Sequence, residues 1–224
     1  MMFKKIADKI GKYTVLLISL LIALILYPVL EGHEIGHICL TLWILITMVT
    51  IVITLDEDKR TYRRIQLASG ILILLIGTLL TRQVLGLSQE FLYHLILPFS
   101  FLFSAYIIWI ILCSIFKRQS LGADELSGAI VSYLLLGIMW GLLYSYIEFI
   151  SLNSFSFASA HDLQAKGSAL FYYSFVTLTT LGYGDILPIS RFARMAAYLE
   201  AVTGVMYTAI LVAGLVGHIG HKQK

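Results

Sequence analysis

The chain has 224 residues, of which 59% are hydrophobic and only 13% are charged, and its formal net charge is +3. A mean hydropathy of +0.88 is far outside the range of soluble globular proteins, so a soluble enzyme or binding module is excluded. The small positive charge follows from the placement of basic residues on one side of a membrane, so it does not indicate a nucleic-acid partner.

Six apolar runs are long enough to cross the hydrocarbon core of a bilayer, which takes about 20 helical residues. Lipid offers no partners to open strand edges, so we expect an all-α membrane protein with six transmembrane helices. We divide the chain into a four-helix N-terminal transmembrane region, residues 1–120, and a second region, residues 121–224. The six expected spans are residues 13–30, 38–55, 65–80, 91–116, 126–150 and 192–219.

Basic residues indicate the orientation of these helices. If the six spans alternate in direction, one side of the membrane holds Lys4, Lys5, Lys9, Lys12, Lys59, Arg60, Arg63, Arg64, Lys117, Arg118, Lys222 and Lys224. The other side holds Arg82, Lys166, Arg191 and Arg194. The positive-inside rule then predicts a multi-pass protein of the plasma membrane with both termini in the cytoplasm. No small-residue cleavage pattern follows the first span, so we expect it to stay uncleaved. We expect no cytoplasmic ligand-binding domain, since the chain stops shortly after the sixth span.

The connection after the first span contains a possible zinc motif. His33-Glu34-Ile35-Gly36-His37 fits H-E-x-x-H, in which two histidines on one helical face bind zinc and the Glu acts as general base. The chain lacks the later Asp-Gly dipeptide that usually supplies a third ligand in intramembrane metalloproteases. Three alternatives therefore stay open: a metalloprotease, a metal or proton sensor at His33 and His37, and a plain polar loop.

The fourth span, residues 91–116, contains no arginine. A voltage sensor needs several arginines along one helix, so that the membrane field does work on them. The first four helices therefore lack gating arginines. Either they respond to a stimulus that the sequence does not reveal, or they form a structural collar.

A short segment after the fifth span reads Thr-Thr-Leu-Gly-Tyr-Gly-Asp, residues 179–185. This order is typical of a potassium filter, in which rings of backbone carbonyls replace the water around the ion. Such a backbone needs conformations closed to most L-residues, and glycine supplies them at alternate positions. We expect Thr180 to add a hydroxyl ring, and Tyr183 to point away from the pore and hold the ring diameter. The predicted ion-binding residues are Thr180, Leu181, Gly182, Tyr183 and Gly184.

Residues 168–188 resemble the pore loop of the tetrameric potassium channel superfamily. An aromatic-rich short helix is followed by Thr-x-Thr-Thr, the filter, an Asp and a nearby Pro. Val176 stands where some members carry a Glu that pairs with this Asp, so that carboxyl pair is absent. The resemblance implies a homotetramer in lipid that conducts potassium passively, with potassium ions but no organic cofactor and no enzyme activity. A weakly selective cation channel is the nearer alternative.

The resemblance also implies that residues 121–224 form a pore domain, which consists of an outer helix, a pore helix, the filter and an inner helix. It further implies roles for residues near the filter. We expect a pore helix that begins with Ser168 as its N-cap and runs to about Leu178. An aromatic cuff around Tyr183 and a carboxylate brace behind the filter are the other expected supports, with plain interfacial aromatics and a solvated helix end as alternatives. The predicted supporting residues are Asp185, Tyr172, Tyr173 and Glu148.

The sixth span contains a glycine and an acid at informative positions. Gly204 is expected either to bend the helix as a hinge or to let it pack closely against the fifth helix. Thr208, Val212 and Val216 follow on the same face and are expected to line the cavity. Glu200 is an acid within a span, so it should be buried and functional, but the sequence does not name its partner.

Overall fold

The computed structural model describes residues 11–30, 88–117, 122–158 and 163–221, together with residues 64, 66, 67, 69–71 and 73. The chain forms two compact units. Unit 1 comprises Met1–Leu92 and Ile110–Ser132, and unit 2 comprises Tyr93–Trp109 and Tyr133–Lys224. The division into regions 1–120 and 121–224 that the sequence predicts stays a prediction.

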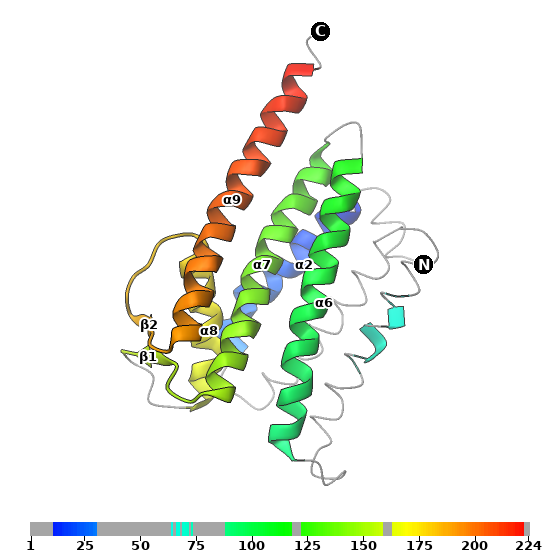
Figure 1. Ribbon diagram of the computed structural model, residues 1–224. Coiled ribbons are helices and arrows are strands. Elements are labelled where there is room, and N and C mark those ends of the chain that lie inside the picture. Colours follow the sequence, from blue (N-terminus) through cyan, green and yellow to red (C-terminus); the bar gives the residue numbers. More distant parts are fainter. Residues whose placement is uncertain are drawn as a thin grey trace. The chain divides into compact units, whose positions relative to one another are not determined.

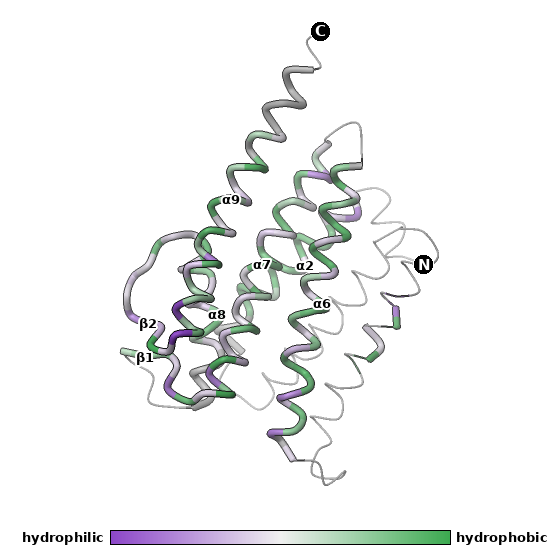
Figure 2. Tube along the Cα trace, in the orientation of Figure 1, coloured by the Kyte–Doolittle hydropathy of each residue, from purple (hydrophilic) through white to green (hydrophobic). Residues whose placement is uncertain are grey.

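The described part of the chain is mostly helical (Figure 1). Its long helices coincide with four of the expected spans: α2, Lys12–Leu30; α6, Gln89–Lys117; α7, Ala123–Ile150; and α9, Arg191–His221. Two segments, Glu90–Phe116 and Ala123–Ile150, are long and apolar enough to cross a membrane. Hydrophobic residues follow one another along most of α6 and α7 in Figure 2. A membrane protein built from apolar helices is therefore supported.

Part of the predicted front half lies outside the described residues. This applies to the second span, residues 38–55, and to His33, Glu34 and His37. Of the third span, residues 65–80, only isolated helical positions are described. The total of six spans stays a prediction.

In unit 1, the first turn of α2 is joined to the first turns of α7. The Oδ1 atom of Asp124 accepts hydrogen bonds from the backbone N–H groups of Tyr13 at 2.9 Å and Thr14 at 3.0 Å. The Thr14 hydroxyl also donates to the Ser127 hydroxyl at 3.1 Å. A side chain of α7 thus satisfies backbone donors that every helix leaves open at its N-terminus.

In unit 2, a short helix and a two-stranded antiparallel sheet flank the beginning of α9 (Figure 1). The helix is α8, Leu163–Leu178, and it packs along α9. Strand β1, Phe155–Phe157, pairs with β2, Ile186–Pro188, so that Ser156 faces Leu187. This sheet was not predicted from the sequence, because strands of only three residues have no recognisable pattern. Its position matters because β2 directly follows the Thr-Thr-Leu-Gly-Tyr-Gly-Asp segment.

Helix α8 lies where the pore helix was predicted, and the prediction was right about its end but wrong about its start. It ends at Leu178 as expected, whereas it begins at Leu163, so Ser168 lies inside the helix and is not its N-cap. The residues before Gly167 explain the difference, since Leu, Gln, Ala and Lys are all good helix formers. The combined helix propensity of these four residues outweighs the tendency of Gly167 to interrupt a helix.

Glycines let α7 and α8 approach each other closely. A Cβ atom placed on Gly137 would lie 2.5 Å from the ring of Phe175, and one on Gly141 would lie 2.5 Å from the ring of Phe171. These distances are shorter than any ordinary carbon–carbon contact, so a larger residue at either position would force the ring to shift. The two aromatic rings of α8 therefore occupy the space that side chains would fill on α7.

Candidate functional site

The backbone of the segment after α8 alternates in conformation. Thr180, Gly182 and Gly184 have positive φ values of 60°, 56° and 79°, whereas Leu181 and Tyr183 between them do not. No atom outside the immediate neighbours lies within 4 Å of a Cβ placed on either glycine. The left-handed backbone, and not crowding, is thus what requires glycine at these two positions. This agrees with the alternate glycine spacing noted in the sequence.

Hydrogen bonds attach both ends of this segment to its surroundings. At the inner end, the Leu181 N–H donates to the Val176 carbonyl of α8 at 2.9 Å. At the outer end, the Asp185 carbonyl accepts from the Ala158 N–H at 3.0 Å, and the Asp185 carboxylate accepts from the Ile186 N–H at 3.2 Å. The segment is therefore anchored to the pore helix on one side and to the sheet region on the other.

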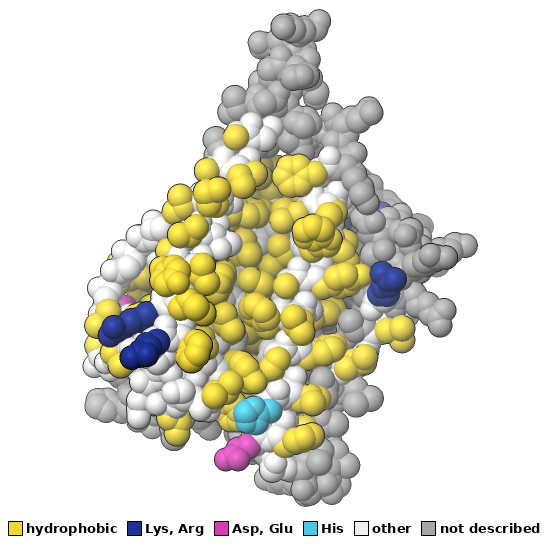
Figure 3. Space-filling view, in the orientation of Figure 1, with side chains coloured by type: hydrophobic (Ala, Val, Ile, Leu, Met, Phe, Trp, Pro, Cys, Tyr) yellow, Lys and Arg dark blue, Asp and Glu magenta, His cyan; other side chains and the backbone are white. Residues whose placement is uncertain are grey.

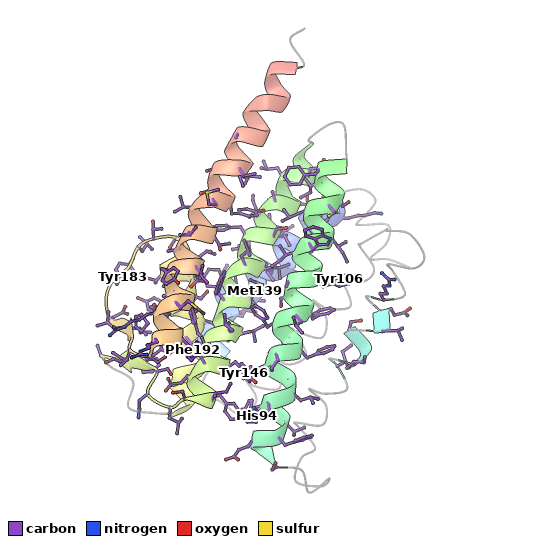
Figure 4. The ribbon with its side chains drawn as sticks, viewed as in Figure 1. His94, Tyr106, Met139, Tyr146, Tyr183 and Phe192 are labelled. Carbon is purple, nitrogen blue, oxygen red and sulfur yellow. The ribbon has the colours of Figure 1, made fainter. Side chains whose placement is uncertain are left out.

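The side chains of this segment are open to their surroundings in the single chain. Leu181 is 60% exposed and Tyr183 is 67% exposed. Figure 4 shows Tyr183 on the loop between α8 and β2, away from α9. The neighbouring Tyr172 is also exposed, and its hydroxyl interacts with the Asp185 carboxylate. A single subunit thus leaves Tyr183 without the packing that its predicted role requires.

Tyr173 lies in a different environment from Tyr172. It is buried, and its ring centroid is 5.1 Å from that of Tyr144 on α7 and 5.5 Å from that of Phe155 on β1. Tyr144 and Phe155 complete the triangle at 5.4 Å. Edge-to-face contacts of this kind stabilise a core by about 0.5–1.5 kcal/mol each. Tyr173 therefore fixes α8 to α7 and β1, and its part in a cuff around Tyr183 stays a prediction.

Glu148 braces the sheet region. Its carboxylate is buried near the end of α7 and accepts hydrogen bonds from the N–H groups of Asn153 at 3.1 Å and Phe155 at 3.2 Å. The same turn supplies the Ser154 carbonyl, which accepts from the Ile189 N–H at 2.7 Å. Glu148 thus holds β1, and β1 in turn holds β2, which follows the predicted filter segment. Glu148 is linked to that segment only through these two strands.

Helix α9 touches the end of α8 at Gly204. This glycine is buried, and a Cβ atom placed on it would strike the carbonyl oxygen of Leu178 at the end of α8. The contact favours close packing, here against the pore helix, and the hinge role stays a prediction. The Thr208 hydroxyl is exposed and bonds to the Val205 carbonyl of its own helix at 2.9 Å. The side chains of Val212 and Val216 lie outside the described residues.

Glu200 has partners that the sequence did not reveal. Its side chain is completely buried, the Tyr144 hydroxyl donates to Oε2, and the Ser174 hydroxyl lies 2.5 Å from Oε1. Tyr144 and Ser174 belong to α7 and α8, so three helices meet at one carboxyl group. Their only signal in the sequence is that they are polar residues within apolar helices, where polar groups need partners.

Comparison with known proteins places this site within a channel-like segment. Residues 132–219 match the family model described as "Ion channel". A stretch covering 24% of the chain is 38% identical to the potassium voltage-gated channel protein shk-1 of Caenorhabditis elegans, of which it covers 10%. A stretch covering 35% of the chain is 28% identical to the calcium-gated potassium channel TvoK of Thermoplasma volcanium, of which it covers 21%. No solved structure matches. The comparisons support the potassium channel superfamily.

The match to the ion channel family model is confined to residues 132–219. It includes most of α7, all of α8, the segment after it and nearly all of α9. Every predicted filter, supporting and cavity residue lies within it. The chain spans about a tenth and a fifth of the two relatives, so their complete activities are not transferred to it.

Proposed function

We propose that this chain forms a potassium-selective channel whose filter consists of Thr180, Leu181, Gly182, Tyr183 and Gly184. The observation that supports it most is the alternation of positive φ at Thr180, Gly182 and Gly184. A backbone that alternates in this way can turn successive carbonyls toward one axis, where they replace the hydration shell of a potassium ion. The two relatives named as potassium channels add independent support.

The proposed channel is a homotetramer of six-helix subunits in the plasma membrane, with the pore helix re-entrant and both termini cytoplasmic. Closing carbonyl rings takes four subunits, and the exposure of Leu181 and Tyr183 fits a filter completed by neighbouring copies. One face of α9 also exposes large apolar side chains, and many yellow hydrophobic side chains lie along the coloured part of this helix in Figure 3. Lipid and the partner subunits would cover such a surface. Potassium ions in the filter are the only cofactor proposed.

The metalloprotease alternative receives no support from the comparisons, since the reported relatives are channels. Among the residues that the structure describes, no group of three His, Cys, Asp or Glu side chains is placed to hold a metal ion. The motif residues His33, Glu34 and His37 lie outside that part of the chain. Whether His33 and His37 sense zinc or protons stays a separate prediction, which external zinc tests on the double alanine variant.

A flux assay tests the proposed function. The purified full chain is placed in liposomes loaded with potassium or with sodium, and the efflux of each ion is followed. We expect rapid potassium efflux and little sodium efflux, and native mass spectrometry should show four subunits. Equal efflux of the two ions would favour the weakly selective channel, and no efflux from either would contradict conduction.

A further inference from the structure

A buried polar cluster lies where α7, α8 and α9 meet in unit 2. It consists of the Glu200 carboxyl group, the hydroxyls of Tyr144 and Ser174, and the backbone carbonyl of Gly137. Glu200 and Ser174 are completely buried, as is Tyr144. No basic side chain in the described part of the chain acts on Glu200, and the other nearby titratable side chains are the tyrosines Tyr133 and Tyr173.

The cluster has more hydrogen bonds than its hydroxyl groups have hydrogens to donate. Three oxygen–oxygen contacts have hydrogen-bond geometry: Tyr144 to Glu200 Oε2, Ser174 to Glu200 Oε1 at 2.5 Å, and Ser174 to the Gly137 carbonyl at 2.7 Å. Each hydroxyl has one hydrogen to donate, so the two hydroxyls supply two hydrogens. A third hydrogen is needed, and a backbone carbonyl has none. The count is complete when the Glu200 carboxyl carries a proton on Oε1 and donates it to Ser174, which then donates to Gly137.

We infer that Glu200 is a positioning residue of the proposed filter, and that it acts as a neutral carboxylic acid tying the pore helix to both the inner and the outer helix. This inference rests on the proposed channel function. A neutral acid is also the form that a completely buried site without a cation favours, because desolvation penalises the charged form.

The cluster reaches the filter through α8. Ser174 lies on the same helix as Val176, whose carbonyl accepts the Leu181 N–H at the inner end of the filter segment. Helix α9 also contacts the end of α8. Its Gly204, which lies one helical turn after Glu200, meets the Leu178 carbonyl. A shift of α8 relative to α9 would therefore move the backbone that fixes the filter. The three hydrogen bonds of the cluster resist such a shift.

Substitutions at Glu200 test whether its side chain acts as a neutral carboxylic acid or as a charged carboxylate. Glu200→Gln keeps the hydrogen count, because its amide N–H donates to Ser174 and its carbonyl accepts from Tyr144. Glu200→Leu has a similar size but leaves both hydroxyls without their partner. We expect the potassium-to-sodium permeability ratio of the Gln variant to stay within about twofold of the wild type, and that of the Leu variant to fall about tenfold.

Tyr144→Phe is the matched variant if Glu200→Leu fails to assemble, since it removes one oxygen and leaves every carbon in place. It should lower the permeability ratio in the same direction. A Gln variant as impaired as the Leu variant would show that the charge is needed and would overturn the inference. Wild-type ratios in both Glu200→Leu and Tyr144→Phe would also overturn it, because the cluster would then have no effect on the filter.

Infrared spectroscopy tests the protonation without any ion current. The difference spectrum between wild type and Glu200→Gln should contain the carbonyl stretch of a protonated carboxyl group. A carboxylate band in its place would contradict the neutral acid. If the wild type conducts no potassium, the proposed channel function is refuted. The infrared spectrum still decides the protonation state of Glu200 in that case.

Discussion

At Gly182, a backbone φ of 56° places the residue in the left-handed region that L-residues rarely adopt. Substitution by alanine there adds strain of about 1–2 kcal/mol in each subunit. We therefore expect Gly182→Ala to insert into membranes but to lose potassium selectivity or conduction, as measured by ion flux in liposomes. The control is Gly70→Ala, at an exposed helical position where a Cβ atom meets nothing within 4 Å. Wild-type selectivity in Gly182→Ala would refute the filter assignment.

Gly204 gives a second prediction for a single residue. Since a Cβ atom there would strike the Leu178 carbonyl, Gly204→Ala should force α9 away from the end of α8 and destabilise the protein by about 1–3 kcal/mol. Thermal unfolding of the purified protein measures the effect. Gly214→Ala is the matched control on the same helix, because nothing lies within 4 Å of its added Cβ atom. Equal stability of the two variants would remove the packing explanation and leave the hinge.

Some residue conformations followed from the sequence and others did not. The positive φ at Gly182 and Gly184 could be predicted, because glycine adopts it without strain. The same conformation at Thr180, with a φ of 60°, could not, because threonine disfavours it and only its surroundings impose it. The partners of Glu200 were equally hidden, since they come from two other helices.

Among the helices, α2 depends on α7 for its N-terminal cap. Asp124→Ala removes the acceptor of the Tyr13 and Thr14 N–H groups and should cost about 0.5–2 kcal/mol. Amide hydrogen exchange at these two residues should therefore become faster. Asp124→Asn keeps an oxygen at the same position and should retain most of the protection. Unchanged exchange in Asp124→Ala would show that α2 is held by other contacts.

The sheet after the filter segment depends on Glu148. Its carboxylate satisfies the buried N–H of Phe155 and also the N–H of Asn153, so Glu148→Leu leaves two donors without a partner. Leaving the buried Phe155 N–H unsatisfied costs about 1–3 kcal/mol, so thermal unfolding should show a clear loss of stability. Glu148→Gln keeps one acceptor oxygen and should be intermediate. If the Leu variant is as stable as the wild type, the hydrogen bonds of Glu148 do not stabilise the sheet.

The elements differ in how well they could be predicted. The apolar lengths of α6 and α7 and the end of α8 followed from composition and motif. The start of α8 did not, because helix propensity before Gly167 outweighed the cap signal at Ser168. Strands β1 and β2 also could not be foreseen, since their pairing joins three residues on each side of the pore helix and has no pattern of its own.

At the scale of the whole molecule, the arginine-free sequence of α6 predicts weak voltage gating. Moving one elementary charge through the membrane field is worth about 2.3 kcal/mol per 100 mV. Helix α6, Gln89–Lys117, contains no arginine, so it should contribute almost nothing. We expect the open probability of single channels to change little between strongly negative and positive voltages. A steep dependence equivalent to several charges per subunit would mean that the front half has another sensor.

The most direct test of potassium-selective conduction is the reversal potential of the purified full chain in a planar bilayer, with potassium on one side and sodium on the other. Carbonyl rings at Thr180–Gly184 should pass potassium far better than sodium, so the reversal potential should lie close to the potassium equilibrium potential and shift with the potassium gradient. A reversal potential near zero with equal concentrations of the two ions would contradict potassium selectivity.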